Sequence, residues 1–187
     1  MSETLAGTGA LVRLGLRRDR WLLSLWILAF AMMSWSSASA GAGLFPEKAS
    51  RIEAANTINA AASMVALFGR VYDPTSLGSL SMIKYTAFMT AALAVLMVSV
   101  TIRHTRADEE SGQLELLGGG RLGRNAPLTA ALVISFGASL VLGLLSGAAL
   151  AATGLPAAGS LAFGLGWAAT GMAFSACLLY TSDAADE

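Results

Sequence analysis

Charged side chains are scarce in this sequence, and they are missing from three long stretches. Asp, Glu, Lys and Arg make up 13% of the residues, whereas hydrophobic residues make up 55%. None of the four charged types occurs in residues 21–46, 85–102 or 125–182. Such a composition excludes the ordinary soluble class, which has about 25% charged residues, and also the disordered class. The sequence therefore predicts an all-α polytopic integral membrane helical bundle.

The uncharged stretches predict about four transmembrane helices, because each crossing needs about 20 mostly apolar residues. Thr153-Gly154-Leu155-Pro156 divides the last stretch into two, since glycine frees the backbone and proline cannot continue a helix. The expected spans are residues 21–44, 81–102 and 126–152, followed by the start of a truncated span at 159–176. The first span also fits a secretory signal peptide that would be cleaved before Gly41, and this alternative leaves the N-terminus on the same side.

Basic residues predict a cytoplasmic N-terminus. Four arginines lie between residues 13 and 20, just before the first span, and the positive-inside rule keeps such a flank in the cytoplasm. We expect residues 1–20 to form a cytoplasmic interfacial helix, with leucines in the headgroups and arginines toward phosphates. The topology then alternates. Residues 45–80 form an extracytoplasmic segment with one amphipathic helix of about five turns, and residues 103–125 form a cytoplasmic loop.

The sequence lacks the groupings that catalysis or metal binding needs. The single histidine, His104, has no Cys, His or carboxylate partner at metal-ligand spacing, and we expect it to be an exposed loop residue. Gly118-Gly119-Gly120 lacks the Lys-Ser/Thr ending and the preceding strand of a nucleotide-binding loop, so it is interpreted as a flexible hinge. We therefore expect no enzyme activity, no bound cofactor or metal, and no nucleic-acid partner.

The loop at 103–125 is the part of the chain best suited to contact another protein. Each of its charges would cost roughly 2.5–3.5 kcal/mol in hydrocarbon, so the loop must face water. Carboxylates and arginines can form charge-assisted bonds with a partner, a glycine permits close approach, and leucines offer an apolar anchor. An alternative is a salt-bridge network within the loop that only keeps it soluble. The candidate partner-binding residues are Arg103, Arg106, Asp108, Glu109, Glu110, Gly112, Glu115, Leu116 and Leu117.

The motif Arg106-x-Asp108-Glu109-Glu110-x-Gly112-x-x-Glu115-Leu116-Leu117 resembles a loop of ABC transporter permeases of the type-2 exporter class. Residues 66–74 and Gly78-x-Leu80 are similar to the subgroup described as actinobacterial exporters of polyketide antibiotics. The resemblance covers residues 5 to about 176. It implies a multi-pass permease of the bacterial cytoplasmic membrane that exports a hydrophobic or amphipathic compound, such as an antibiotic or another drug-like molecule. It also implies that the loop docks on a separate ABC ATP-binding subunit, which binds and hydrolyses the ATP.

Two other functions fit the same architecture. A membrane scaffold or sensor would share these spans without moving a substrate, and the absence of a neighbouring gene for an ATP-binding subunit would favour it. A secondary transporter fits less well, because such proteins usually place ionisable groups within the bilayer and the expected spans have none.

The last eleven residues, 177–187, differ from the Gly/Ala-rich sequence before them and look like translated read-through of a sequencing adapter. We therefore expect the natural sequence to continue past Ala176 into further spans. A true short tail is the alternative. The only cysteine, Cys177, lies in this segment, so cysteine usage indicates nothing about the redox compartment.

Overall fold

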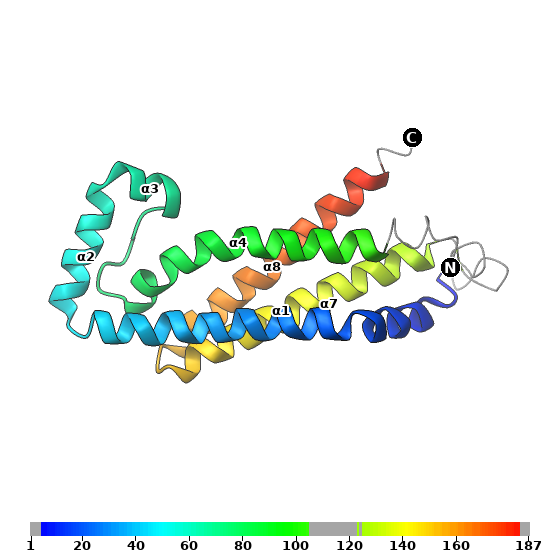
Figure 1. Cartoon of the computed structure of the whole chain (residues 1–187), viewed down its shortest axis with the longest axis horizontal. Helices are drawn as coiled ribbons and strands as arrows, with labels where there is room; N and C mark the ends of the chain where they lie inside the picture. Colours follow the sequence, from blue (N-terminus) through cyan, green and yellow to red (C-terminus); the bar gives the residue numbers. More distant parts are fainter. Residues whose placement is uncertain (1–4, 105–122, 124, 184–187) are drawn as a thin grey trace. The chain divides into compact units, whose positions relative to one another are not determined.

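A computed structural model describes residues 5–104, 123 and 125–183. All regular structure in this described part is helical, which confirms the all-α class. Four of the helices are long and apolar enough to cross a membrane: α1, α4, α7 and the portion of α8 up to Leu178. The helices, drawn in Figure 1, are α1 (Thr8–Leu44), α2 (Lys48–Ala60), α3 (Ala62–Phe68), α4 (Leu77–His104), α7 (Ala126–Ala152) and α8 (Ala157–Asp183).

The first helix is longer than the sequence predicts. Instead of an interfacial helix at 1–20 and a separate span at 21–44, α1 runs without a break over 37 residues. Proline is absent from this range, and the helix ends at Leu44, two residues before Pro46, where the ring restricts the preceding residue. Because about 20 residues suffice to cross the hydrocarbon, the arginine-bearing turns can extend beyond it.

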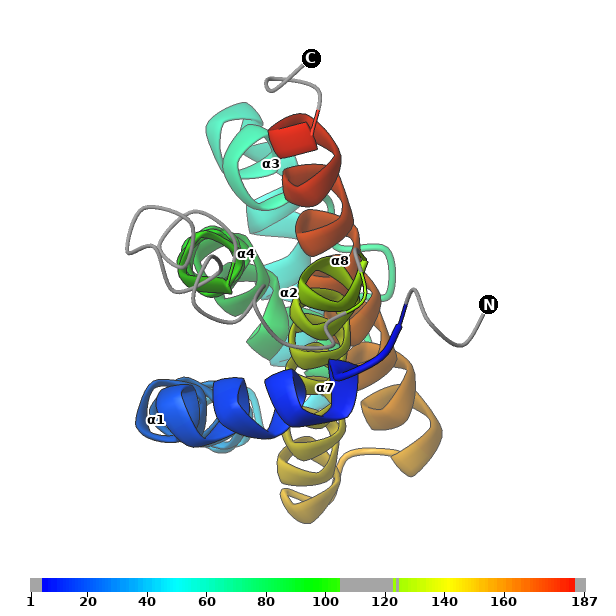
Figure 2. The same cartoon turned by 90° about the vertical axis from the view of Figure 1, so that its right-hand side faces the viewer.

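The amphipathic helix expected within residues 45–80 is two helices. Ala61 has extended dihedral angles (φ −88°, ψ 105°) and separates α2 from α3. In Figure 1 and Figure 2, the axis of α2 runs across the axis of the first turns of α4. The break lets Asn59 bind the chain after α3: its amide Nδ2 donates to the Val71 carbonyl at 3.0 Å, and its Oδ1 accepts from the Val71 N–H at 2.9 Å.

The helix α8 also differs from its expected bounds, 159–176. It begins at Ala157, directly after Pro156, and continues to Asp183. Proline is well suited to the position before a helix or in its first turn, where no backbone N–H is required.

The chain forms two compact units, and each long helix contributes a part to both. Unit 1 comprises residues 1–27, 93–141 and 166–187, and unit 2 comprises residues 28–92 and 142–165. In unit 1, the core surrounds Met97, which is fully buried. The hydroxyls of Ser139 on α7 and Ser175 on α8 lie 3.5 and 3.1 Å from its Sδ.

In unit 2, small residues bring the helices close together. Gly143 and Gly147 on α7 face α8, and a Cβ added at Gly147 would lie 2.8 Å from the Ser160 carbonyl oxygen. A Cβ at Gly41 on α1 would lie 2.5 Å from Cβ of Ser81 on α4. Membrane helices commonly associate through such small residues, because dispersion contacts between close backbones replace the hydrophobic effect.

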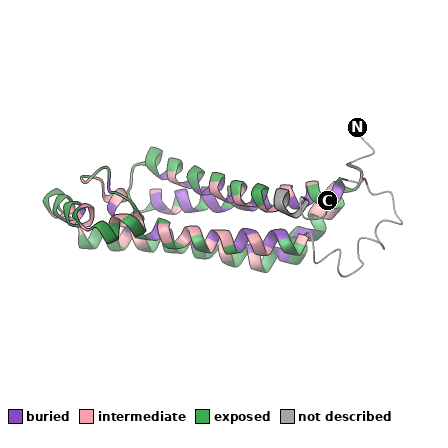
Figure 3. Ribbon diagram, turned by 90° about the horizontal axis from the view of Figure 1, so that it is seen from above, coloured by how far each residue is buried: buried purple, intermediate pink, exposed green. Residues whose placement is uncertain are grey.

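Large apolar side chains are exposed on the long helices. They include Trp21, Leu25 and Leu28 on α1 and Phe88 and Val95 on α4, each more than half exposed. Figure 3 shows buried positions along one side of the long helices and exposed positions along the other. In water such surfaces would favour aggregation, whereas lipid tails cover them. This distribution is the one expected of a multi-pass membrane protein.

Candidate functional site

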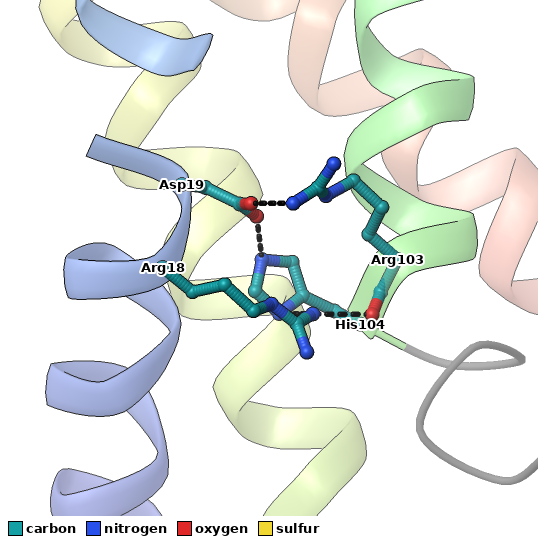
Figure 4. A network of polar contacts seen from close by, with 4 residues as sticks. All are labelled: Arg18, Asp19, Arg103 and His104. Atoms are coloured by element: carbon teal, nitrogen blue, oxygen red, sulfur yellow. Dashed lines mark hydrogen bonds and ion pairs between the residues drawn. The ribbon is translucent and has the colours of Figure 1, made fainter. Parts of the chain in front are cut away.

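A buried carboxylate in unit 1 joins α1 to the end of α4. Asp19 on α1 is fully buried, and its Oδ1 lies 2.8 Å from Nη2 of Arg103. Its Oδ2 lies 2.8 Å from Nε2 of His104. Figure 4 shows both partners reaching Asp19 from α4, together with Arg18 on the same turn of α1. We call these four residues the charge cluster.

The local sequence of α1 makes room for the imidazole. Gly15 lies one helical turn before Asp19 and therefore on the same face. A Cβ at Gly15 would lie 2.8 Å from Cε1 of His104 and 2.5 Å from Cδ1 of Ile134, so any larger residue would displace them. The His104 side chain is only 7% exposed as a result of this packing.

Arg18 also contacts the last described turn of α4. Its Nη2 donates to the Arg103 carbonyl oxygen and lies 3.5 Å from Nδ1 of His104. A cation beside the C-terminal carbonyls of a helix interacts favourably with the helix dipole. Arg18 therefore adds a further contact between α1 and α4.

His104 contacts groups of opposite charge through its two ring nitrogens. Its Nε2 lies beside the Asp19 carboxylate, and its Nδ1 lies 3.5 Å from Nη2 of Arg18. The imidazole therefore lies between an anion and a cation.

Charge explains why the cluster acts as a joint between two helices. Moving a carboxylate out of water costs several kcal/mol, and close cationic or polar partners are needed to offset that cost. Asp19 has both partners on α4, so separating α4 from α1 would leave a buried charge unpaired. The side chain of Arg103 is 45% exposed and remains accessible to water, whereas the other side of the joint is dry.

The structure changes the interpretation of two residues. His104 was expected to be an exposed loop residue, but it is the last residue of α4 and its side chain is buried against Asp19. The expectation was wrong because a contact with a residue so distant in sequence has no local signature. Arg103, a candidate for partner binding, forms its described ion pair with Asp19 on α1.

The other predicted partner-binding residues lie outside the described residues: Arg106, Asp108, Glu109, Glu110, Gly112, Glu115, Leu116 and Leu117. The glycine hinge at 118–120 lies outside them as well. Sequence reasoning missed Arg18 and Asp19. One signal was available. Gly15, Asp19 and Leu23 are spaced four residues apart, so Asp19 lies on the same face of the helix as a glycine and a leucine, where a charged residue is unexpected.

The described residues contain no group of three or more His, Cys, Asp or Glu side chains that could hold a metal ion.

The chain is similar to a protein of Mycobacterium tuberculosis named a multidrug efflux system permease protein. The two are 43% identical over 171 residues, which is 91% of this chain but 31% of the relative. The chain thus spans about a third of the length of the curated relative it matches. No protein-family model matches the chain.

Proposed function

We propose that this chain is a membrane-spanning part of the permease subunit of an ABC exporter of the type-2 class. The exported compound is hydrophobic or amphipathic, in keeping with the antibiotic exporters that the sequence resembles. A separate subunit binds and hydrolyses ATP. The similarity to a protein named a multidrug efflux permease supports the transporter part of this proposal.

The observation that carries the proposal is the position of the charge cluster. Asp19 contacts Arg103 and His104, which lie just before the acidic-Gly-Glu-Leu motif of the loop at 103–125. If an ATP-binding subunit docks on that loop, its movement pulls on the end of α4. Because α4 is joined to α1 through a buried charge, the two helices move together. A scaffold would need no loop that contacts an ATPase.

The proposal places the N-terminus and the loop at 103–125 in the cytoplasm, where ATP is available. The arginines of α1 support this orientation, since Arg13, Arg17, Arg18 and Arg20 all lie in its first turns. They form a cationic flank next to the uncharged part of the helix.

The test changes the loop carboxylates in the permease, expressed together with a candidate ATP-binding subunit. Glu115→Ala, and Glu109→Ala combined with Glu110→Ala, should leave the amount of permease in the membrane near normal. Both variants should weaken co-purification of the ATPase and lower substrate-stimulated hydrolysis, because losing a hydrogen-bonded charge at a protein contact typically costs about 2–5 kcal/mol. Gly119→Ala in the glycine hinge is the matched control.

Unchanged subunit association and hydrolysis in both carboxylate variants would contradict docking. That result would favour the alternative, in which salt bridges within the loop only keep it soluble. The absence of any ATP-binding subunit that co-purifies with the unmodified permease would favour the scaffold or sensor instead.

A further inference from the structure

Unit 2 contains a cavity of about 460 Å³ that the charge cluster does not touch. Its wall comes from the end of α3 and the chain after it, the first turns of α4, and the hairpin between α7 and α8. Much of the wall is apolar and includes Phe68, Met82, Leu155 and Phe163. Cavities of roughly 300–1,000 Å³ with apolar walls and a few polar groups are typical of sites for drug-sized molecules.

One polar group in this wall has no partner. Ser160 on α8 is 3% exposed and lines the cavity, yet its hydroxyl has no hydrogen-bond partner among the described residues. Ser175, by contrast, bonds to the Gly171 carbonyl four residues earlier at 2.9 Å, while Ser135 and Ser146 also lack a described partner but do not line the cavity. Since buried hydroxyls are normally hydrogen-bonded, rotation of the Ser160 side chain toward the cavity would let a ligand group bond to its hydroxyl.

The wall also carries a single formal charge, which is positive. Arg70 lines the cavity, and no carboxylate is among the described lining residues. The residues on both sides of Arg70 have a defined backbone. Gly69 has a positive φ of 85°, and Val71, which is 5% exposed, forms two hydrogen bonds with the side chain of Asn59. A guanidinium on a fixed backbone favours an acidic ligand group over a cationic one.

The segment that follows Arg70 is ordered by its own hydrogen bonds. The hydroxyl and the backbone N–H of Thr75 donate to Oδ1 of Asp73 at 2.7 and 2.9 Å, and these bonds hold the pKa of Asp73 below its ordinary value. The carboxylate of Asp73 thus stabilises its own turn. The lip of the cavity near Arg70 is therefore preformed.

We propose that this cavity binds an amphipathic organic anion. The apolar body, aromatic or alkyl, lies against Phe68, Met82 and Phe163, its acidic group faces Arg70, and a hydrogen-bonding group reaches Ser160. Two sources share this chemistry: a free drug-like acid and a fatty acid from the membrane. The inference rests on the proposed function where it names an exported class, but binding itself requires no ATP-binding subunit.

The test measures fluorescence of two matched probes on the purified full chain in lipid nanodiscs, with empty nanodiscs subtracted. The anionic probe is 1-anilinonaphthalene-8-sulfonate, and the neutral probe, N-phenyl-1-naphthylamine, has the same ring system without the sulfonate. We expect the anionic probe to bind about tenfold more tightly. Arg70→Gln should remove that difference, and Ser160→Ala should weaken binding of the anionic probe about two- to tenfold.

A cavity-filling variant tests the location of the site. A Cβ at Gly78 would lie 3.6 Å from Oγ of Ser76 and 4.0 Å from Cδ2 of Leu155, and all three residues line the cavity. Both distances are ordinary contacts, so Gly78→Leu should fill the space without disturbing α4 and should abolish saturable binding. Gly43→Leu on α1 is the matched control, because a Cβ there meets nothing within 4 Å.

Equal binding by Gly78→Leu and Gly43→Leu, with circular dichroism showing both folded, would overturn the site. Equal affinity of the unmodified chain for the two probes would overturn the anionic preference. Native mass spectrometry distinguishes the sources: a fatty acid that remains on the unmodified chain but not on Gly78→Leu supports the membrane source, and an empty chain that binds the sulfonate supports the free acid. Binding that persists when no ATP-driven export is found would separate this inference from the proposed function.

Discussion

Replacing Asp19 is the sharpest test of the charge cluster. Asp19→Ala removes the contacts of both Arg103 and His104 with the buried carboxylate. The contact with Arg103 contributes little, about 0–1 kcal/mol, because the arginine side chain is 45% exposed and water can solvate it. The contact with His104 is dry on both sides, and a buried polar group that loses its partner costs about 1–3 kcal/mol. We therefore expect the free energy of unfolding to fall by about 1–4 kcal/mol.

The measurement is a titration of the purified chain with sodium dodecyl sulfate in mixed micelles, with helix content followed by circular dichroism. Asp19→Asn keeps the shape and one acceptor oxygen, so it should cost less than Asp19→Ala. Arg17→Ala, an exposed change two residues away, should stay within about 0.5 kcal/mol of the unmodified chain.

A double-mutant cycle isolates the contact itself. Asp19→Asn combined with His104→Ala should be less destabilising than the sum of the two single changes, by about 1 kcal/mol or more. Residues that do not interact add within about 0.3–0.5 kcal/mol. Additive effects would refute the joint between α1 and α4 and remove the observation on which the coupling role rests.

Two further outcomes follow from the same structure. In the same titration, Gly164→Ala should destabilise the chain by about 1–3 kcal/mol, because its Cβ would collide with the backbone of α7. Gly166→Ala is the control and should be neutral or stabilising, because its Cβ meets nothing within 4 Å. In a Cys177→Ser background, Ser63→Cys should react with a membrane-impermeant thiol reagent in intact cells and Ser111→Cys should not, since the arginines of α1 keep its flank inside; labelling of Ser111→Cys from outside would reverse the topology.

Much of the fold could be predicted from the sequence, because it follows from one local requirement. A helix that crosses hydrocarbon needs a continuous run of apolar residues, and the absence of charge from three stretches marked those runs directly. Thr153-Gly154-Leu155-Pro156 likewise divides α7 from α8, because glycine and proline act on the backbone locally. Gly154 indeed has a φ of 87°.

The charge cluster was decided by tertiary structure. Arg18 and Arg103 are 85 residues apart, and nothing in the local pattern indicates that a carboxylate among arginines on α1 will bind a histidine at the end of α4. Asp19 becomes buried only because Gly15 allows α4 to approach, so its pairing is a property of packing.

Tertiary structure also decided two further features: the boundary between α2 and α3, and the lack of a partner for the Ser160 hydroxyl. Asn59 uses both ends of its amide on Val71, and the chain breaks at Ala61 in spite of good helical spacing. Ser160 resembles any other helical serine in the sequence, and its hydroxyl lacks a partner only because of what surrounds it in the folded chain. Apolar runs decide which segments enter the membrane, whereas polar contacts between distant segments depend on geometry that only the packed helices create.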